Sequence, residues 1–226
     1  MTHLEGKVVL VLGASGGLGS RIAAQLTDAG ATVVRAARNP GTLFGPDAYL
    51  ADLQAPTGAA SLVAAAIAAH GQLDGVVVAA GVVAFGPAEA LDDTALAELF
   101  ATNTLAPIRA IRDSFLALKE SAAAKRDPFV VTISGVVAES PMAGLAAYSA
   151  SKAGLAAFVA SAGKEYRRSG IRLLDARPGH TGTDLSTHPV AGTAPAFGAA
   201  LDPDAVAARI VRAIIDGDKD LPSSAF

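Results

Sequence analysis

Tyr148 and Lys152 stand four residues apart in the segment Tyr148-Ser-Ala-Ser-Lys152. On a helix this spacing puts a phenol and an ammonium on one face, one turn apart. Because a nearby positive charge favours the phenolate, Lys152 is expected to lower the pKa of Tyr148 from its ordinary value of about 10. A phenol tuned in this way can act as a general acid or base near neutral pH. Surface Tyr and Lys often meet at this spacing by chance, so the pair needs support from the rest of the chain.

A glycine cluster near the N-terminus is the second feature with chemical potential. The segment Gly13-Ala-Ser-Gly-Gly17-Leu-Gly19 directly follows an apolar run and precedes a helical pattern. Glycines let the backbone turn tightly and approach a pyrophosphate, which the free N–H groups and dipole of a helix N-terminus attract. At the first strand–helix junction of a chain, this cluster predicts a dinucleotide-binding loop.

The end of the second expected strand reads Val33-Val34-Arg35-Ala36-Ala37-Arg38 and carries no acidic residue. A dinucleotide-binding fold that selects NAD usually has an acid here, which holds the 2′-hydroxyl of the ribose. Arg38 instead offers a guanidinium whose fork suits a 2′-phosphate. The sequence therefore favours NADP(H), with NAD(H) possible. Asp52, after the third strand, is either an acceptor for the adenine amino group or a helix cap.

The elements that must position these residues are short apolar runs alternating with longer helical patterns. Runs that are apolar throughout are typical of parallel strands covered on both faces. The expected strands are Lys7–Leu12, Thr32–Ala36, Ala48–Ala51, Gly75–Ala79, Phe129–Ser134 and Arg172–Ala176. The expected helices are near Gly17–Ala29, Thr57–His70, Thr94–Ser121, Tyr148–Arg168 and Asp202–Asp216. This alternation predicts an α/β fold, a doubly wound parallel sheet flanked by helices in three α/β/α layers.

No linker, charge block or internal repeat divides the 226 residues, so one domain over residues 1–226 is expected. The irregular region from Pro178 to Leu201 is rich in Gly, Pro, Thr and Ala. It follows the sixth strand, where a doubly wound sheet places a loop over its ligand crevice. The region is either a disordered connection or a short substrate lid, around residues 184–201.

Composition narrows the classes of function. The net charge of −3 gives no basic field for binding nucleic acid or an anionic membrane. There is no cysteine and the four histidines are scattered, so neither disulfide chemistry nor a metal site is expected. The apolar run from Val8 to Leu12 is too short for a signal peptide or a membrane span. We therefore expect a cytoplasmic protein without nucleic-acid or membrane partners.

The glycine loop, Asn103, the Tyr148–Lys152 pair and Pro178-Gly179 follow one another in an order that resembles the short-chain dehydrogenase/reductase family. The resemblance runs from Lys7 to about Asp184. Members of this family are single-domain, Rossmann-type oxidoreductases that move a hydride between NAD(P)(H) and an alcohol or carbonyl. The resemblance implies the same fold and reaction class for this chain.

The resemblance also implies roles for single residues. Tyr148 would exchange a proton with the substrate oxygen, and Lys152 would bind the nicotinamide ribose and lower the pKa of Tyr148. Asn103 would hold a water of the proton relay. The segment Val78-Ala79-Ala80-Gly81 lacks the two asparagines usual after the fourth strand. The cofactor-binding residues implied in this way are Gly13, Ser15, Gly16, Gly17, Leu18, Gly19, Arg38, Asp52, Leu53, Ala79, Ala80, Gly81, Tyr148, Lys152, Pro178, Gly179, Thr181 and Thr183.

One expected catalytic residue is missing. The family carries a serine thirteen residues before the tyrosine, and residue 135 is glycine. Ser134 is adjacent, and a bulge or turn at Gly135 could swing it into the site; Ser140 is a second candidate donor. Ser134 is included among the candidate catalytic residues, while Ser140 and no replacement at all stay open. Without a replacement, the loss of one donor to a developing oxyanion costs about 2.7–4 kcal/mol.

These observations favour an NADP(H)-dependent oxidoreductase that acts on a small neutral or apolar carbonyl or alcohol. The region between Gly179 and Leu201 supplies apolar residues and no Lys or Arg to recruit an anion. The alternative is a non-catalytic NADP-binding regulator or redox sensor, which Gly135 and the lost asparagines would suit. A weaker third hypothesis is another dinucleotide-fold enzyme such as a methyltransferase, in which the Tyr148–Lys152 pair has no role.

Assembly is predicted from the two long expected helices, Thr94–Ser121 and Tyr148–Arg168, and from the end of the chain. The helix from Tyr148 carries a face of small residues that would let a partner helix approach, as family members usually pair through such helices. The end of the chain, Leu221 to Phe226, lacks the glycine-rich strand of many tetrameric members. A homodimer is therefore expected in preference to a tetramer.

Overall fold

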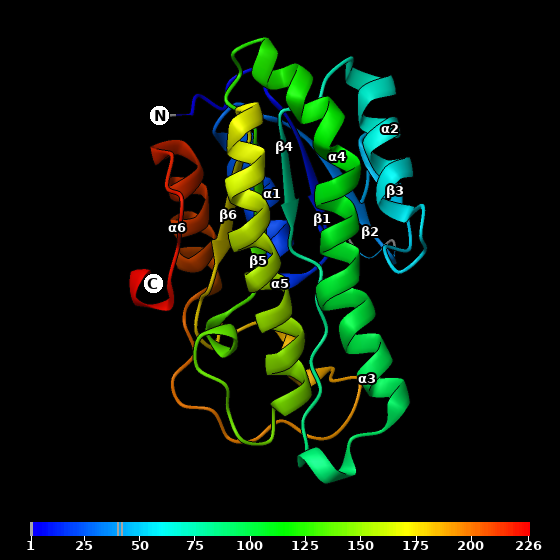
Figure 1. The fold of residues 1–226 in the computed structure, drawn as a ribbon, viewed down its shortest axis with the longest axis vertical. Coiled ribbons are helices and arrows are strands. Elements are labelled where there is room, and N and C mark those ends of the chain that lie inside the picture. Colours follow the sequence, from blue (N-terminus) through cyan, green and yellow to red (C-terminus); the bar gives the residue numbers. More distant parts are fainter. Residues whose placement is uncertain (1, 40, 42) are drawn as a thin grey trace.

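The computed structural model describes residues 2–39, 41 and 43–226, whose elements form three layers with a sheet between two sets of helices (Figure 1). Within these residues six parallel strands make one sheet in the order β3-β2-β1-β4-β5-β6. The strands are β1 (Val8–Leu12), β2 (Thr32–Ala37), β3 (Ala48–Leu50), β4 (Gly75–Val78), β5 (Phe129–Ile133) and β6 (Arg172–Ala176). Each lies within one residue of its expected range. The doubly wound fold is confirmed, and its strand order reverses between β1 and β4, where such sheets bind ligands.

Helices cover both faces of the sheet. α1 (Gly17–Asp28) and α6 (Pro203–Asp216) pack together on one face. The other face is covered by three helices, α2 (Gly58–His70), α4 (Ala106–Ala123) and α5 (Ala146–Tyr166). The shorter α3 (Asp93–Phe100) leads into α4.

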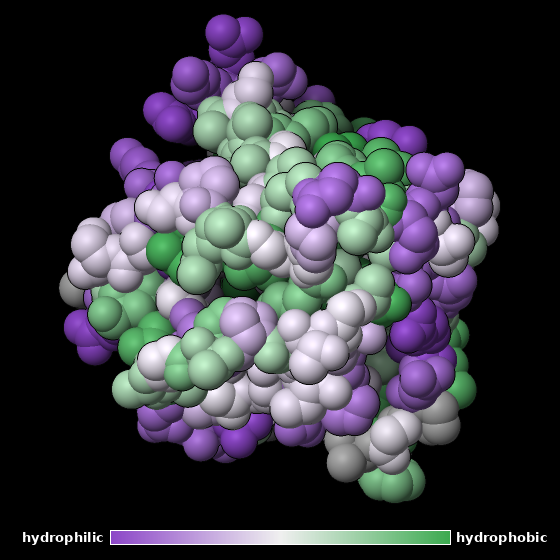
Figure 2. All heavy atoms as spheres, turned by 90° about the horizontal axis from the view of Figure 1, so that it is seen from below, coloured by the Kyte–Doolittle hydropathy of each residue, from purple (hydrophilic) through white to green (hydrophobic). Residues whose placement is uncertain are grey.

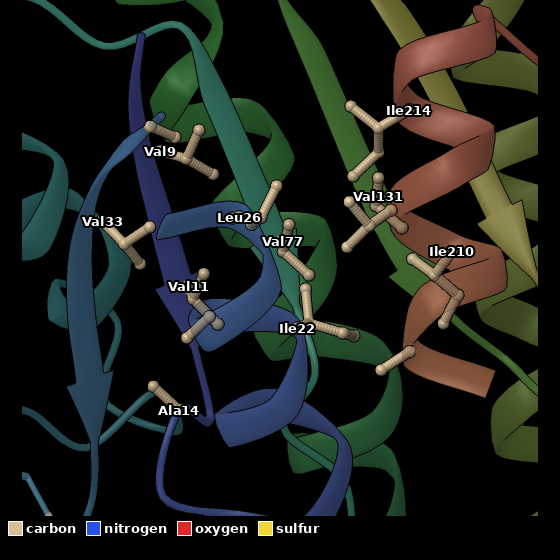
Figure 3. Packing of buried hydrophobic residues seen from close by; sticks show 14 of the residues in the cluster. Val9, Val11, Ala14, Ile22, Leu26, Val33, Val77, Val131, Ile210 and Ile214 are labelled. Atoms are coloured by element: carbon tan, nitrogen blue, oxygen red, sulfur yellow. The ribbon is translucent and has the colours of Figure 1, made fainter. Parts of the chain in front are cut away.

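The core forms because strand side chains alternate between the two faces of the sheet. Val9 and Val11 of β1 join one apolar cluster with Ile210 of α6, and all three side chains are fully buried (Figure 3). Leu10 and Leu12 join a second cluster under α2, α4 and α5. Because helices cover both sides, every residue of β1 is apolar and buried, which explains the unbroken apolar run in the sequence.

The helical run expected at Thr94–Ser121 is present from Asp93 to Ala123 with Pro107 inside it, and it contains a π-helical turn that was not predicted. The structure has α3, then a π-helical turn at Ala101–Leu105, then α4. Pro107 stands in the first turn of α4 and has no N–H to donate to the carbonyl four residues before it. A π-turn lets the chain absorb this break without ending the helix, and such turns frequently mark functional sites.

The loops that follow the strands gather at one end of the molecule, the lower end in Figure 1, which Figure 2 shows face on. The region expected as a lid is fastened there at two places. Ala191 forms a bridge with Ala84, and Leu201 forms a bridge with Thr181. The region is therefore an ordered loop, and the alternative of a disordered connection is wrong.

In the described part of the chain, no helix combines the length and the hydropathy that a membrane span requires. Within the same residues, no group of three or more His, Cys, Asp or Glu side chains is arranged to hold a metal ion.

Candidate active site

The glycine loop packs so tightly that three of its positions exclude a side chain. A Cβ on Gly13, whose φ is +84°, would lie 2.5 Å from the amide nitrogen of Ala80. A Cβ on Gly19 would lie 2.1 Å from the carbonyl oxygen of Gly13. A Cβ on Gly17 would lie 2.7 Å from Cβ of Thr183. The structure thus brings together three of the segments expected to bind the cofactor.

The N-terminus of α1 is open to an anion. Gly16 is the N-cap, and no side chain accepts a hydrogen bond from the first turn. The first N–H groups of a helix have no partner within the helix, and its dipole adds positive potential there. Ser15 is exposed and Leu18 is half-buried beside this turn. A glycine cradle that leads into an uncapped helix fits the pyrophosphate of a dinucleotide.

The adenosine side of the expected site lies beyond β2. Arg38 exposes 59% of its side chain, and its Nη1 lies 4.0 Å from Oε1 of Glu98. Asp52 accepts a hydrogen bond from the amide of Gln54 at 2.9 Å within the loop after β3. The N-cap of α2 is Thr57, so the expectation that Asp52 caps a helix is wrong. The side chain of Gln54 in turn donates to the hydroxyl of Thr102 at 2.9 Å, which joins the Asp52 loop to the π-turn. The adenine contact of Asp52 and the phosphate contact of Arg38 stay predictions.

Asn103 lies inside the π-turn and is fully buried. Its side-chain amide bonds both backbone groups of Val82, donating to the carbonyl at 2.8 Å and accepting from the N–H at 2.9 Å. It also donates to the hydroxyl of Ser151 on α5 at 3.1 Å. Asn103 therefore ties the loop after β4 to α5, and Pro107 leaves its backbone carbonyl without an α-helical donor.

Gly81 is where the loop after β4 meets these helices. A Cβ built on Gly81 would lie 3.3 Å from Oδ1 of Asn103 and 3.4 Å from Nζ of Lys152. The same residue is half-buried at the end of the strand, next to Ala80, which touches the glycine loop. Asn103, Lys152 and the expected cofactor loop are thus brought to one place, at the carboxyl end of β4.

The Tyr148–Lys152 pair occupies one face of α5, as its spacing predicts, with Nζ 5.9 Å from the centre of the phenol ring. The expected pKa shift of the tyrosine is wrong. Burial raises the pKa of Tyr148 to about 12, opposite to the effect of a nearby positive charge. Burial also lowers the pKa of Lys152 to about 8, although the charge of Asp175 opposes that shift. The largest cause of both pKa shifts is desolvation, because burial removes the two side chains from water.

The expected replacement of the missing serine is not supported by the geometry. Ser134 is fully buried, and its hydroxyl donates to a carboxylate oxygen of Asp175. As placed, that hydroxyl is not free to donate to a substrate. Ser140 is exposed, beyond the short helical turn that begins at Val136. Gly135 has a φ of +78°, a conformation that residues with a Cβ rarely adopt.

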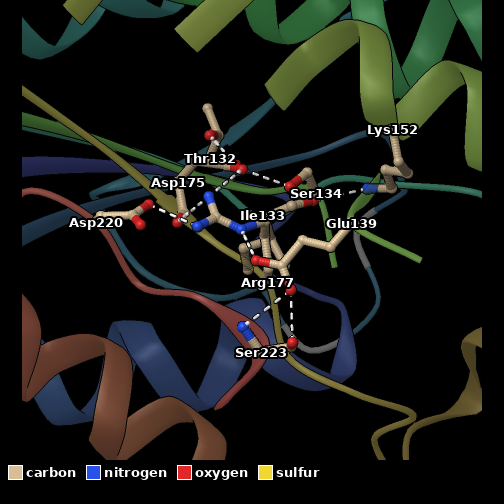
Figure 4. A network of polar contacts seen from close by, with 9 residues as sticks. All are labelled: Thr132, Ile133, Ser134, Glu139, Lys152, Asp175, Arg177, Asp220 and Ser223. Atoms are coloured by element: carbon tan, nitrogen blue, oxygen red, sulfur yellow. Dashed lines mark hydrogen bonds and ion pairs between the residues drawn. The ribbon is translucent and has the colours of Figure 1, made fainter. Parts of the chain in front are cut away.

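A polar network behind the catalytic segment was missed in the sequence (Figure 4). Arg177 contacts three carboxylates, those of Asp175, Glu139 and Asp220. Glu139 also accepts hydrogen bonds from the backbone and hydroxyl of Ser223, near the end of the chain. The one available signal was the pattern Asp175-Ala-Arg177, because residues two apart on a strand point to the same side.

The segment after β6 runs between the catalytic loop and the lid. The carbonyl of Pro178 accepts from the amide of Val136 at 2.8 Å. The hydroxyl of Thr181 donates to the carbonyl of Gly179 at 3.0 Å, so this hydroxyl is used within its own segment. Thr183 lies against the glycine loop, as described above.

An apolar wall surrounds Tyr148 on the substrate side. Tyr148 packs against a cluster that includes Phe85 and Leu145, and Phe197 of the lid joins the same cluster. The ring of His180 stacks on Phe197 with centroids 4.2 Å apart. Phe85 and Leu145 also line a pocket of about 270 Å³ between the loop after β4, the start of α5 and the lid.

Comparison with known proteins agrees with this geometry. The family model for short chain dehydrogenases matches residues 7–192. A dehydrogenase/reductase SDR family protein 7-like of Anopheles gambiae is 30% identical over 97% of this chain and 75% of its own length. The 3-oxoacyl-[acyl-carrier-protein] reductase of Escherichia coli is 29% identical over 81% of this chain and 77% of that protein.

A solved structure gives the same result for the fold. The 3-ketoacyl-(acyl-carrier-protein) reductase of Brucella melitensis, complexed with NADH, superposes with a TM-score of 0.85. The alignment covers 97% of each chain at 22% identity, so it speaks for the fold alone. With the family model and the relatives in agreement, the chain belongs to the short-chain dehydrogenase/reductase family of oxidoreductases.

Proposed function

We propose that this oxidoreductase transfers a hydride between NADP(H) and a small neutral or apolar carbonyl or alcohol, with Tyr148 as general acid and base. The observation that carries the proposal is the buried cluster in which Asn103, Gly81 and Lys152 meet next to the glycine loop. A chain with only a nucleotide-binding role could use the ammonium of Lys152 for the ribose, but it would have no need for the phenol of Tyr148 beside it. Family membership also favours the enzyme over the regulator, because the matching family model is one of dehydrogenases.

The bound nicotinamide would supply the hydride, and side chains of the protein would transfer the proton to the substrate oxygen. Tyr148 holds its proton well above neutral pH, because burial raises its pKa to about 12. A protonated phenol is the form needed to donate to a carbonyl oxygen that gains negative charge during reduction. Lys152 would bind the nicotinamide ribose and supply positive charge close to the phenol as that proton leaves.

Asn103 would complete this arrangement by holding a water through its backbone carbonyl. Two features support the assignment. The side chain of Asn103 is fully used by Val82 and Ser151, so its position is rigid. Pro107 leaves the carbonyl without its α-helical donor. We leave Ser134 out of the proton-transfer set, because its hydroxyl is held by Asp175.

The preference for NADP(H) rests on Arg38. Its guanidinium stands at the carboxyl end of β2 and is largely exposed, while its contact with Glu98 is a long one at 4.0 Å. A 2′-phosphate would compete well for such a guanidinium through two charge-assisted hydrogen bonds. NAD(H) stays possible, since the fold also binds NADH in the Brucella melitensis protein.

The apolar nature of the substrate is supported by the walls of the pocket next to Tyr148. These contain Phe85, Leu145 and several Ala and Gly residues, and Asp92 is the one charged side chain. The carboxylate of Asp92 accepts from the amide of Ala95 at 2.8 Å and caps α3. In Figure 2, neutral and apolar residues occupy the centre of this face, and hydrophilic residues gather toward its rim. Walls of this composition would favour the binding of an uncharged substrate.

The test compares the wild type with Tyr148→Phe. NADPH oxidation is measured against a panel of ketones and aldehydes, and NADPH binding is measured by fluorescence titration. Loss of the phenol should lower kcat/KM at least about 100-fold for any substrate found, because a general acid contributes that much or more. The Kd for NADPH should change little, since the hydroxyl is the only group removed.

Two outcomes would contradict the proposal. Turnover that survives in Tyr148→Phe would remove the tyrosine from the reaction. Tight NADPH binding with no turnover in either protein would favour the non-catalytic regulator. The cytoplasmic location and the homodimer stay predictions, which fractionation and light scattering would check.

A further inference from the structure

Asp175 is a buried carboxylate that the proposed reaction does not use. It lies on β6, and 5% of its surface is exposed. The hydroxyl of Thr132 donates to it at 2.7 Å, the hydroxyl of Ser134 also donates to it, and Nη1 of Arg177 lies 3.4 Å away. A buried ion is costly unless it is paired and hydrogen-bonded. Three partners satisfy the hydrogen-bonding capacity of this carboxylate. What remains to be explained is why the fold buries a charge at this position.

The reason lies on the neighbouring strand (Figure 4). Nζ of Lys152 donates to the carbonyl oxygen of Ile133 at 2.8 Å. Ile133 stands between Thr132 and Ser134, the two residues whose hydroxyls bind Asp175. Three successive residues at the end of β5 therefore hold the ammonium with a backbone carbonyl and the carboxylate with two hydroxyls. The ammonium of Lys152 and the carboxylate of Asp175 are thus both hydrogen-bonded to residues 132–134.

Among the described residues, the nearest neighbours of Lys152 on its own helix and on the loop after β4 carry no charge. On its own helix it lies near the neutral phenol of Tyr148. From the π-turn and the loop after β4, the uncharged Asn103 and Gly81 approach it. From β6, the charge of Asp175 acts on Lys152 and opposes the loss of its proton.

Arg177 does not fully neutralise the charge of Asp175, because its guanidinium is shared among several carboxylates. Its guanidinium also binds Glu139 and, at 2.6 Å, Asp220. Three carboxylates thus surround one guanidinium, which leaves negative charge in the network. Asp175 is the member of this network whose carboxylate is also held by the end of β5, the segment that binds Lys152.

We propose that Asp175 is the buried counter-charge of Lys152, a positioning residue that keeps the catalytic ammonium protonated and oriented, with Ser134 and Thr132 holding the carboxylate in place. The proposal rests on the proposed function of Lys152 in proton transfer. It also accounts for Ser134, whose hydroxyl serves the counter-charge instead of the substrate.

The electrostatics of both groups agree with this arrangement. Burial lowers the pKa of Lys152 to about 8, and the charge of Asp175 acts against that loss. Burial raises the pKa of Asp175, while hydrogen bonds from Ser134 and Thr132 and the charge of Arg177 act against protonation. Removing the carboxylate would therefore leave Lys152 with desolvation alone and shift its titration to lower pH.

The experiment measures the protonation of Lys152 directly. Protein labelled with ¹³C at lysine Cε is titrated by NMR, and the Lys152 signal is assigned by its absence in Lys152→Met. Asp175→Asn is compared with Asp220→Asn. Each variant removes one carboxylate from Arg177 and changes the net charge equally, but Asp220 is exposed on the rim of the network. Where a substrate is known, the pH profile of kcat/KM for reduction is recorded as well.

In Asp175→Asn the pKa of Lys152 should fall by about one unit or more, and the high-pH limb of kcat/KM should move down with it. Asp220→Asn should shift both by less than about a third as much, since its charge lies in solvent. Equal shifts in the two variants, or none in Asp175→Asn, would overturn the proposal.

A measurement on the wild type guards against a variant that does not fold. The Cγ shift of Asp175 in ¹³C-labelled protein should report an ionised carboxylate at neutral pH, where Lys152 is charged. A protonated Asp175 at neutral pH would overturn the proposal. These titrations need no turnover, so a failure of the proposed reaction and a failure of the counter-charge are told apart.

Discussion

Replacing Lys152 with methionine should stabilise the folded protein at neutral pH while it abolishes turnover. Methionine keeps an unbranched side chain of similar length, and it removes the charge that the fold buries. The side chain of Lys152 is 6% exposed, and burial lowers its pKa from 10.5 to about 8. A depressed pKa of a base means that the folded state holds the proton less well than the unfolded state does.

The magnitude follows from that difference. A shift of about 2.5 units, at about 1.4 kcal/mol per unit, means that the charged Lys152 costs about 3 kcal/mol of unfolding free energy below pH 8. Between about pH 8 and 10.5 the unfolded state binds more protons, so the stability of the wild type rises with pH. Lys152→Met has no such cost, although it loses the hydrogen bond to Ile133, worth about 1 kcal/mol. A net gain of about 2 kcal/mol at pH 7 is expected.

The assay is urea unfolding of both proteins at pH 7 and pH 9.5, analysed by linear extrapolation. The wild type should recover about 2 kcal/mol relative to Lys152→Met over this interval, because most folded molecules lose the proton and most unfolded ones keep it. Lys164→Met is the control, because Lys164 is exposed on the same helix and its ammonium stays in water in both states. A gap between wild type and Lys152→Met that is the same at both pH values would refute the reasoning.

Two more substitutions test other parts of the site. Arg38→Asp should weaken NADPH binding and shift the ratio of NADPH to NADH affinity toward NADH, because the guanidinium proposed to bind the 2′-phosphate becomes a repelling carboxylate; an unchanged ratio would exclude Arg38 from this role. Gly135→Ser should not raise turnover and should lower the unfolding free energy by about 1–3 kcal/mol, since φ at this position is +78°. Gly135→Ala carries the same backbone strain without the hydroxyl, so a higher kcat in the serine variant alone would contradict this expectation.

The sheet could be predicted from the sequence because its physics is local and periodic. A strand such as Val8–Leu12 is apolar at every position, which only a strand covered on both faces requires. The glycine loop was readable for a similar reason, since close backbone packing at Gly13 and Gly19 tolerates no other residue. These signals depend on single residues and their nearest neighbours in the chain.

What escaped prediction depends on contacts between distant segments. Pro107 was visible in the sequence, but whether it ends, kinks or widens a helix depends on how α3 and α4 pack. The pKa of Tyr148 has the same character, because burial by the lid and the loop after β4 outweighs the lysine one turn away. Spacing alone records the attraction and leaves out the desolvation.

Ser134 illustrates the limit most clearly. Its position beside Gly135 suggested a substitute for the missing serine, and its direction depends on a carboxylate forty-one residues later in the chain. Asp175 itself carried little signal, because an acidic residue in a strand is more often exposed at an edge than held by two hydroxyls. The pair becomes interpretable only when β5 and β6 lie side by side.

The backbone at Gly135 has an evolutionary consequence. Some glycine and serine codons differ by a single nucleotide, so the family's usual residue lies one mutation away in the genetic code. In the fold it lies further, since the chain would have to leave a left-handed conformation before a serine fitted without strain. A serine at this position would therefore carry a strain of about 1–3 kcal/mol unless the backbone changed as well. The backbone conformation thus favours the residue that departs from the family pattern.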